Sequence, residues 1–225
     1  LSFGHLYKIS VAERAKPQPI TRGFYSYGQA SWVPDGSGVI FTTQGDSLLH
    51  PDRSLRSRVV RVDTDGGSWT TLLSDPERSF TQPSLSPDSK TLAFITSVAA
   101  NKPGTLDQGR LGLLTLGSPN AKPLLPPFDR SPANLTWSAD SRYLYYTAPS
   151  NGGFPVYRMD ASNRKIDQLL DFNVGVNALD VSRSGVIFVK TDITNPSELY
   201  TADLLFKNEA VLSAHNSTWL QGKAI

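Results

Sequence analysis

The sequence contains no cysteine among its 225 residues. A chain without cysteine can form neither a disulfide framework nor a thiolate zinc site. The absence is compatible with a reducing cytoplasm and with a bacterial periplasm. The compartment therefore stays open between periplasm and cytoplasm, and we assume a bacterial origin.

Long apolar runs and an excess of one charge are also missing. No run approaches the roughly 20 apolar residues that a membrane helix needs, and the first ten residues lack the layout of a signal peptide. Lysine plus arginine number 22 and aspartate plus glutamate 20, so no basic stripe for nucleic acid and no patch for a membrane is indicated. The composition, 39% hydrophobic and 19% charged, predicts a soluble globular chain.

Helix signals are weak as well. Proline at 16 positions and glycine at 17 interrupt most windows, and no long segment repeats apolar residues at the helical period. We therefore expect almost no helix.

What the sequence does contain is one hairpin pattern in four copies, each with an apolar residue, a polar turn and an apolar and aromatic run. The copies are ASWVPDGSGVIFTTQ at 30–44, PSLSPDSKTLAFITS at 83–97, LTWSADSRYLYYTAP at 135–149 and LDVSRSGVIFVKTDI at 179–193. The turn residues Asp35, Asp88, Asp140 and Ser184 lie 53, 52 and 44 residues apart. The Asp-Gly, Asp-Ser and Ser-Gly pairs in these turns favour tight reversals, which supports the hairpins.

Two further apolar stretches follow each hairpin. The third stretches are at 58–63, 110–116, 155–160 and 198–204, and the fourth are at 69–73, 121–125, 166–170 and 209–213. Their aliphatic and β-branched residues favour strands. Four strands per repeat at this period predict an all-β fold, a β-propeller of four-stranded antiparallel blades. The alignment places Trp32, Leu85, Trp137 and Val181 at equivalent positions on innermost or second strands.

The same pattern gives the blade boundaries, about four and a half blade units in all. We expect a partial blade at 1–28, blades at about 29–78, 79–130, 131–174 and 175–216, and a connector at 217–225. Because 5–11 and 18–23 read as a third and a fourth strand, the chain is expected to open within a blade and to be a fragment. Open blade edges leave strands unpaired, so self-association through these edges is also expected.

The closing run from Thr191 to Ile225, together with the SPDS turns that precede aromatic strands, resembles the prolyl oligopeptidase family of serine peptidases. The similarity is greatest to its dipeptidyl and acylaminoacyl peptidase branches. In that family a P-x-E-L-Y strand of the last blade is followed by a leucine, threonine or serine, x, x, asparagine segment that leads into an α/β-hydrolase domain. The matching residues are Pro196, Glu198, Leu199, Tyr200, Leu212, Ser213 and Asn216.

This resemblance implies a propeller that filters or orients short peptides for a hydrolase domain outside this chain. It transfers no catalytic residue, because the family's Ser-Asp-His triad places its serine in a G-x-S-x-G turn and no such string occurs here. No glutamate pair that would hold a substrate amino terminus is found either. We therefore assign no catalytic, cofactor-binding or metal-binding residue.

Three further groups of residues are interpreted without a chemical role. The single histidines His5, His50 and His215 are expected at surface or loop positions. DTDGG at 63–67 resembles the start of a calcium loop but lacks the later glycine and glutamate, so a hairpin turn is expected. Six strand aromatics are expected to pack between blades rather than to line a peptide channel. They are Trp32, Trp137, Tyr143, Tyr145, Tyr146 and Phe188.

Two functions follow from these observations. The first is the non-catalytic propeller part of a serine exopeptidase. The second is a stand-alone periplasmic propeller of the Tol type, which presents loops or its central channel to a protein partner. The peptidase-like closing run favours the first, and a downstream domain with a nucleophile elbow would distinguish the two.

Overall fold

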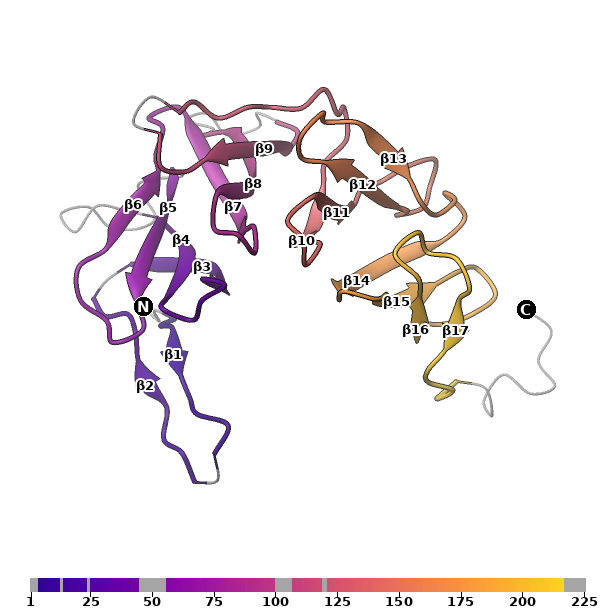
Figure 1. Cartoon of the computed structure of the whole chain (residues 1–225), viewed down its shortest axis with the longest axis horizontal. Coiled ribbons are helices and arrows are strands. Elements are labelled where there is room, and N and C mark those ends of the chain that lie inside the picture. Colours follow the sequence, from indigo (N-terminus) through magenta and orange to yellow (C-terminus); the bar gives the residue numbers. More distant parts are fainter. Residues whose placement is uncertain are drawn as a thin grey trace. The chain divides into compact units, whose positions relative to one another are not determined.

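The computed structural model describes residues 4–12, 14–23, 25–44, 56–99, 107–118 and 121–216. These residues form strands joined by turns, and no helix is found among them (Figure 1). Consequently the described ranges contain no helix long and apolar enough to cross a membrane. The scarcity of helix predicted from proline and glycine is thus confirmed here. The expected connector at 217–225 lies outside the described residues.

The chain divides into two compact units, and the first contains the described residues of 1–85 and 89–125. In this unit β1 pairs with β2, β3 to β6 form a four-stranded sheet, and β7 to β9 form a three-stranded sheet, all antiparallel. The strands are β1 (Tyr7–Lys8), β2 (Gln18–Pro19), β3 (Ser26–Trp32), β4 (Gly38–Gln44), β5 (Ser57–Asp63), β6 (Thr70–Leu73), β7 (Arg78–Leu85), β8 (Thr91–Val98) and β9 (Arg110–Thr115).

The second unit contains 86–88 and the described residues from 126 onward, and it holds two four-stranded antiparallel sheets. β10 (Ala133–Trp137), β11 (Tyr143–Thr147), β12 (Val156–Asp160) and β13 (Ile166–Gln168) form one sheet. β14 (Gly175–Val181), β15 (Val186–Thr191), β16 (Glu198–Ala202) and β17 (Ala210–Val211) form the other. In every sheet neighbouring strands are also consecutive in the sequence, as the hairpin repeats predict.

The repeat alignment identifies equivalent positions correctly. Each of the four aligned residues is the last residue of the first strand of its sheet, and each faces a residue at the start of the second strand. The pairs are Trp32 with Val39, Leu85 with Leu92, Trp137 with Leu144 and Val181 with Val186. All four first strands also carry a register shift before this pair, which the sequence pattern does not reveal.

The turns between first and second strands are held by their own side chains. In β10–β11, Ser138 Oγ donates to Asp140 Oδ1 at 2.5 Å, and the same oxygen accepts from the backbone N–H of Arg142 at 3.0 Å. The β14–β15 turn has no aspartate at this position. There the Ser182 hydroxyl accepts from the N–H groups of Ser184 and Gly185 at 3.2 and 3.1 Å. Each turn thus supplies a side-chain acceptor for backbone N–H groups that no strand satisfies.

The strand expected at 121–125 is not formed. Only one bridge joins Leu124 to β9, through two backbone hydrogen bonds with Leu113 at 2.8 and 2.9 Å. Pro126 stands at the next position that would face β9 and has no N–H to donate, so the ladder cannot continue past Leu124 in that direction. The β7–β9 sheet is therefore three-stranded.

The core of the first unit lies on both faces of β3–β6. One face packs against β7–β9, where Ile40 and Val59 join Phe80 and Phe94 in a buried cluster. The other face buries Phe41 in a cluster that includes Ile20, beside β2. The Ser57 hydroxyl also links β5 to β7, because it donates to Phe80 O and accepts from Phe80 N, both at 2.6 Å.

The core of the second unit lies between its two sheets. Tyr145 and Val156 from one sheet pack with Val176, Val186 and Phe188 from the other. Four of the six strand aromatics interpreted as core residues are buried, namely Trp137, Tyr145, Tyr146 and Phe188, and Tyr143 is half-buried.

The interpretation is wrong for Trp32, whose exposed fraction is 57%. Trp32 is the last residue of β3 and borders an open pocket with Lys8, Ile9 and Gln18 of the β1–β2 segment. The short strands β1 and β2 do not cover its ring.

Phe94 tests the packing between the two sheets of the first unit. Its ring is fully buried and meets Phe80 edge to face at 5.5 Å between centroids. We expect Phe94→Ala to lower the free energy of unfolding by about 3–5 kcal/mol, because the cavity lies between two sheets that cannot collapse onto it. Val98→Ala, at a 47% exposed position of the same strand, is the control and should cost about 0.5 kcal/mol or less. Equal losses in urea unfolding would contradict this packing.

Candidate functional site

Two polar sites stand out in the second unit, and the first is formed by the residues that carry the family resemblance. The Glu198 carboxylate, on β16, accepts from the Ser213 hydroxyl and from the backbone and side-chain N–H groups of Asn216 at 2.8 and 2.9 Å. Ser213 Oγ in turn accepts from the backbone N–H of Leu199 at 2.9 Å. Residues up to 18 positions apart in the sequence are thus joined through one carboxylate.

The remaining motif residues lie around this network. Leu212 donates its N–H to Leu199 O at 2.7 Å, and Tyr200 stacks on Phe188 with centroids 5.8 Å apart. Pro196 is half-buried in the segment before β16. We name Glu198, Ser213 and Asn216 the exit network, because they fix the chain where it leaves β17.

Hydrogen bonds dominate the electrostatics of the exit network. The hydroxyl of Ser213 and then the N–H of Asn216 lower the pKa of Glu198, against a smaller opposing effect of desolvation. Glu198 therefore stays ionised at neutral pH and keeps accepting all of these hydrogen bonds.

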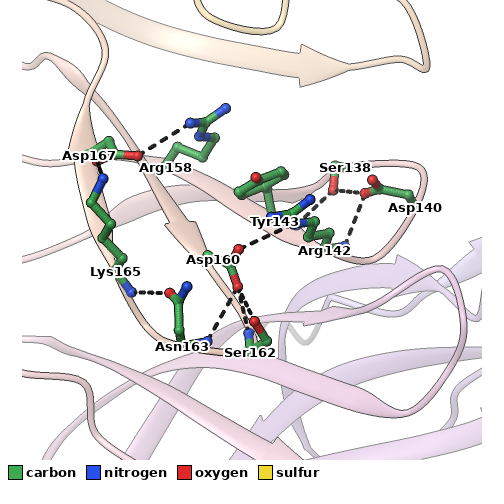
Figure 2. A network of polar contacts seen from close by, with 10 residues as sticks. All are labelled: Ser138, Asp140, Arg142, Tyr143, Arg158, Asp160, Ser162, Asn163, Lys165 and Asp167. Carbon is green, nitrogen blue, oxygen red and sulfur yellow. Dashed lines mark hydrogen bonds and ion pairs between the residues drawn. The ribbon is translucent and has the colours of Figure 1, made fainter.

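The second site is a polar cluster on the sheet β10–β13 (Figure 2). Arg158 on β12 lies opposite Tyr145 on β11 and Asp167 on β13, so the three side chains share one face. Its Nη2 donates to Asp167 Oδ2 at 3.3 Å, and its guanidinium lies over the Tyr143 ring, 4.3 Å from the centroid. Its side chain is only 16% exposed. Arg158 is therefore held in one place by an acid and an aromatic ring.

The charge of Arg158 is secured by these partners. Burial disfavours the guanidinium, but Asp167 and the Tyr145 hydroxyl outweigh it, and the pKa of Arg158 is raised. Asp167 also accepts from Lys165 Nζ at 3.0 Å, and this contact, followed by that with Arg158, lowers the pKa of Asp167.

Asp160, on the same strand, organises the turn that follows β12. Its carboxylate accepts from the Ser162 hydroxyl at 2.5 Å, from the Ser162 N–H at 2.9 Å and from Arg142 Nε at 3.2 Å. The Ser162 hydroxyl makes the largest contribution to a pKa of about 2 for Asp160, against the opposing effect of desolvation. Arg142 is thereby tied to Asp160, while Arg158 is tied to Asp167.

A pocket of about 230 Å³ opens beside this cluster, between the β10–β11 and β14–β15 turns. Asp140, Tyr143 and Arg158 line it from one sheet, and Arg183 and Leu204 line it from the other. Such a pocket offers two guanidinium groups, one carboxylate and apolar walls. Its lining residues include no histidine, so they do not form a Ser-His-Asp triad.

The histidines and the DTDGG segment occupy positions of the kind that the sequence indicated. His5 is half-buried in a loop with its ring 5.6 Å from that of Tyr27, His215 is exposed in a turn, and His50 lies outside the described residues. Gly66 donates its N–H to Asp63 O at 2.9 Å, which closes a turn. Within the described ranges, no group of three or more His, Cys, Asp or Glu residues could hold a metal ion.

Sequence reasoning missed Arg158 and Asp167. A signal was available, because PVYRMD and IDQLL were both read as adjacent strands, and a register that pairs opposite charges would have joined Arg158 to Asp167. The pocket had no such signal, since its walls come from turns more than 40 residues apart.

Comparisons with known proteins agree with this fold. No protein-family model matches the chain. Dipeptidyl-peptidase 5 of Arthroderma otae is 26% identical over 152 residues, which is 63% of this chain but only 20% of that relative. The chain thus spans about a fifth of the length of this curated relative.

Solved structures give the fold directly. A TolB candidate from Agrobacterium tumefaciens superposes with a TM-score of 0.71 at 16% identity, over 93% of this chain and 74% of that chain. Acylaminoacyl peptidase of Pyrococcus horikoshii superposes with a TM-score of 0.64 at 16% identity, over 93% of this chain and 30% of that one. The chain therefore has a β-propeller fold. Together these matches fit the propeller region of a prolyl oligopeptidase family peptidase, in agreement with the resemblance found in the sequence.

Asp160 provides a pH-dependent test of the polar cluster. A pKa of about 2 in place of 3.8 corresponds to about 2 kcal/mol of stabilisation. Because the folded pKa lies below the unfolded one, this stabilisation is complete above about pH 4 and is lost as the pH falls towards 2. We expect Asp160→Asn to cost about 1–2 kcal/mol at pH 7 in urea unfolding, with the difference from wild type shrinking below pH 4.

The control for this experiment is Asp129→Asn, which removes a carboxylate that is 94% exposed and only 3.7 Å from Arg130. It should change stability by less than about 0.5 kcal/mol at either pH. A difference for Asp160→Asn that is independent of pH would show that its carboxylate is not the source of the stabilisation.

Glu198→Gln tests the exit network by hydrogen exchange. We expect faster exchange at the backbone N–H groups of Asn216 and Leu199 at pH 7, because the charged acceptor that holds both ends is removed. Since the pKa of Glu198 is lowered, the protection in wild type should persist at and above its ordinary value and fall only below it. Glu209→Gln, which removes a carboxylate paired with Lys190 in the same sheet, should leave both groups protected. Unchanged exchange in Glu198→Gln would disprove the anchoring role.

Proposed function

We propose that this chain is the non-catalytic β-propeller part of a serine exopeptidase of the dipeptidyl or acylaminoacyl peptidase type. In this proposal it gates or orients short peptides for an α/β-hydrolase domain outside the chain. It contributes one partial blade and four blades, with the boundaries given by the sequence pattern. Self-association through open blade edges belongs to the same proposal.

The exit network carries this proposal. The residues that resemble the family's last blade and its connector are spaced over 196–216, yet Ser213 and Asn216 both bind the carboxylate of Glu198. These hydrogen bonds hold the chain segment after the last strand against β16. We expect this in a propeller whose chain continues into a further domain. The similarity to dipeptidyl-peptidase 5 supports the same assignment.

A second candidate function is a stand-alone propeller of the Tol type that binds a protein partner. It is favoured by the superposition on the TolB candidate, of which this chain covers 74%. The two functions differ in one chemical property, because only the peptidase has an activated serine nucleophile.

A fluorophosphonate probe separates the two functions. We expect the protein purified from its own organism to be labelled and to migrate well above the 24.5 kDa of this chain. The 225-residue chain by itself should be unlabelled and should not hydrolyse dipeptidyl or acyl-aminoacyl chromogenic substrates, because it has no nucleophile elbow. A native protein that stays unlabelled would overturn the peptidase assignment and favour the binding propeller. Labelling of the isolated chain would overturn its non-catalytic role.

A further inference from the structure

The pocket between the β10–β11 and β14–β15 turns is lined by charged, aromatic and apolar side chains. Six of its lining residues matter for recognition: Asp140, Tyr143, Tyr145, Arg158, Arg183 and Leu204. Its volume of about 230 Å³ is below the range of about 300–1,000 Å³ typical of drug-sized ligands. It therefore fits one end of a small molecule or peptide rather than a large ligand.

Arg158 supplies a cation with unused hydrogen-bonding capacity. A guanidinium has five N–H donors. The Asp167 contact, at 3.3 Å, uses Nη2 and is longer than an ordinary charged hydrogen bond. Nε is buried, so a ligand in the pocket cannot reach it. The Tyr145 hydroxyl is a second partner of the guanidinium. The remaining Nη N–H groups leave Arg158 able to bind a further anion while it stays attached to Asp167.

The position of Arg158 is fixed before any ligand arrives. It lies on the central part of a sheet, between Tyr145 and Asp167, and its guanidinium rests on the Tyr143 ring. A side chain held in this way loses little conformational freedom on binding, so more of the interaction energy becomes affinity. Arg142, the neighbouring arginine, is tied to Asp160 and does not line the pocket.

Arg183 supplies the second cation, from the opposite side of the pocket. It lies at an exposed position in the β14–β15 turn and forms no ion pair with any residue that the structure describes. Two guanidinium groups that line one small pocket are the arrangement that recognises a carboxylate or a phosphate.

Asp140 favours a peptide carboxylate over a phosphate as the ligand. Its carboxylate also lines the pocket and is fixed by Ser138 Oγ and the N–H of Arg142. Inorganic phosphate carries one to two negative charges near pH 7, which this carboxylate repels, and it has no N–H group, so its one or two P–OH groups are its only donors. The carboxyl end of a peptide brings amide or amino N–H groups next to its carboxylate, and its last side chain can contact Tyr143 and Leu204.

We propose that this pocket binds the carboxyl end of a short peptide, with Arg158 and Arg183 facing the carboxylate and Asp140 accepting a peptide N–H. The choice of a peptide as ligand rests on the proposed function. The recognition of the carboxylate rests on the residues of the pocket alone, so it holds whether or not a hydrolase domain is attached.

Calorimetric titration of the full chain with glycyl-phenylalanine, and with its carboxyl-terminal amide, tests the proposal. We expect the free acid to bind at least about tenfold more tightly than the amide, because the amide cannot form charge-assisted hydrogen bonds with two guanidinium groups. Arg183→Ala should weaken binding of the acid by about tenfold, and Arg183→Lys should weaken it less. Arg183 is exposed, so these variants are expected to fold, which circular dichroism verifies.

Arg110→Ala is the matched control, since it removes an exposed arginine from the other compact unit. Its affinity for the dipeptide should equal that of the wild type. Equal binding of acid and amide, no binding of the acid at millimolar concentration, or inorganic phosphate that competes as well as the dipeptide would each overturn the proposal. The fluorophosphonate experiment reports separately on the proposed function, so a failure of one does not imply a failure of the other.

Discussion

Burial of sheet faces against neighbouring sheets is the constraint on which this structure depends. Six of the seven residues of β4 are buried, and successive side chains point to opposite faces. Ile40 joins the cluster shared with β7–β9, while Phe41 joins the cluster beside β2. A sheet that is apolar on both faces cannot be stable alone in water, so each blade requires a neighbour.

Polar groups lie both in the turns and on the strands. Within each unit the sheets pack face to face, and buried polar residues such as Ser57 and Asp160 lie on their inner strands. Asp140 and Ser182 each accept backbone N–H groups within two of the turns. The pocket beside Arg158 lies between these two turns, which belong to the two sheets of the second unit.

In the exit network, residues of the sequence motif are joined by hydrogen bonds. Glu198 is on β16, and Ser213 and Asn216 follow the next strand, β17. After β17 the chain therefore comes back to the carboxylate of Glu198. The intervening strand is only two residues long, Ala210–Val211, and contributes few ladder hydrogen bonds. The chain after it is fixed by hydrogen bonds to the Glu198 carboxylate and by others to the backbone of Leu199 and Ser197. The low pKa of Glu198 keeps that carboxylate charged under ordinary conditions.

The sequence by itself determined the strands, their order and the repeat, because alternation and turn chemistry are local properties. Asp35, Asp88 and Asp140 marked the hairpins, and Trp137 and Val181 proved equivalent. Predictions from the local sequence were wrong where the outcome depended on residues outside the strand. Leu124 forms a bridge instead of a strand between prolines, and Trp32 stays exposed because its neighbours do not reach it.

Only the tertiary structure decided which polar residues meet. The register of β11, β12 and β13 brings Arg158 between Tyr145 and Asp167, and a slip of one residue would turn Arg158 to the opposite face. The pairing of Glu198 with Asn216 and the approach of Arg183 to Arg158 likewise depend on contacts between segments far apart in the chain. The first of these contacts depends on the path of the chain after β17, and the second on packing between the two sheets of the second unit. Neither is determined by the order of residues along a single strand.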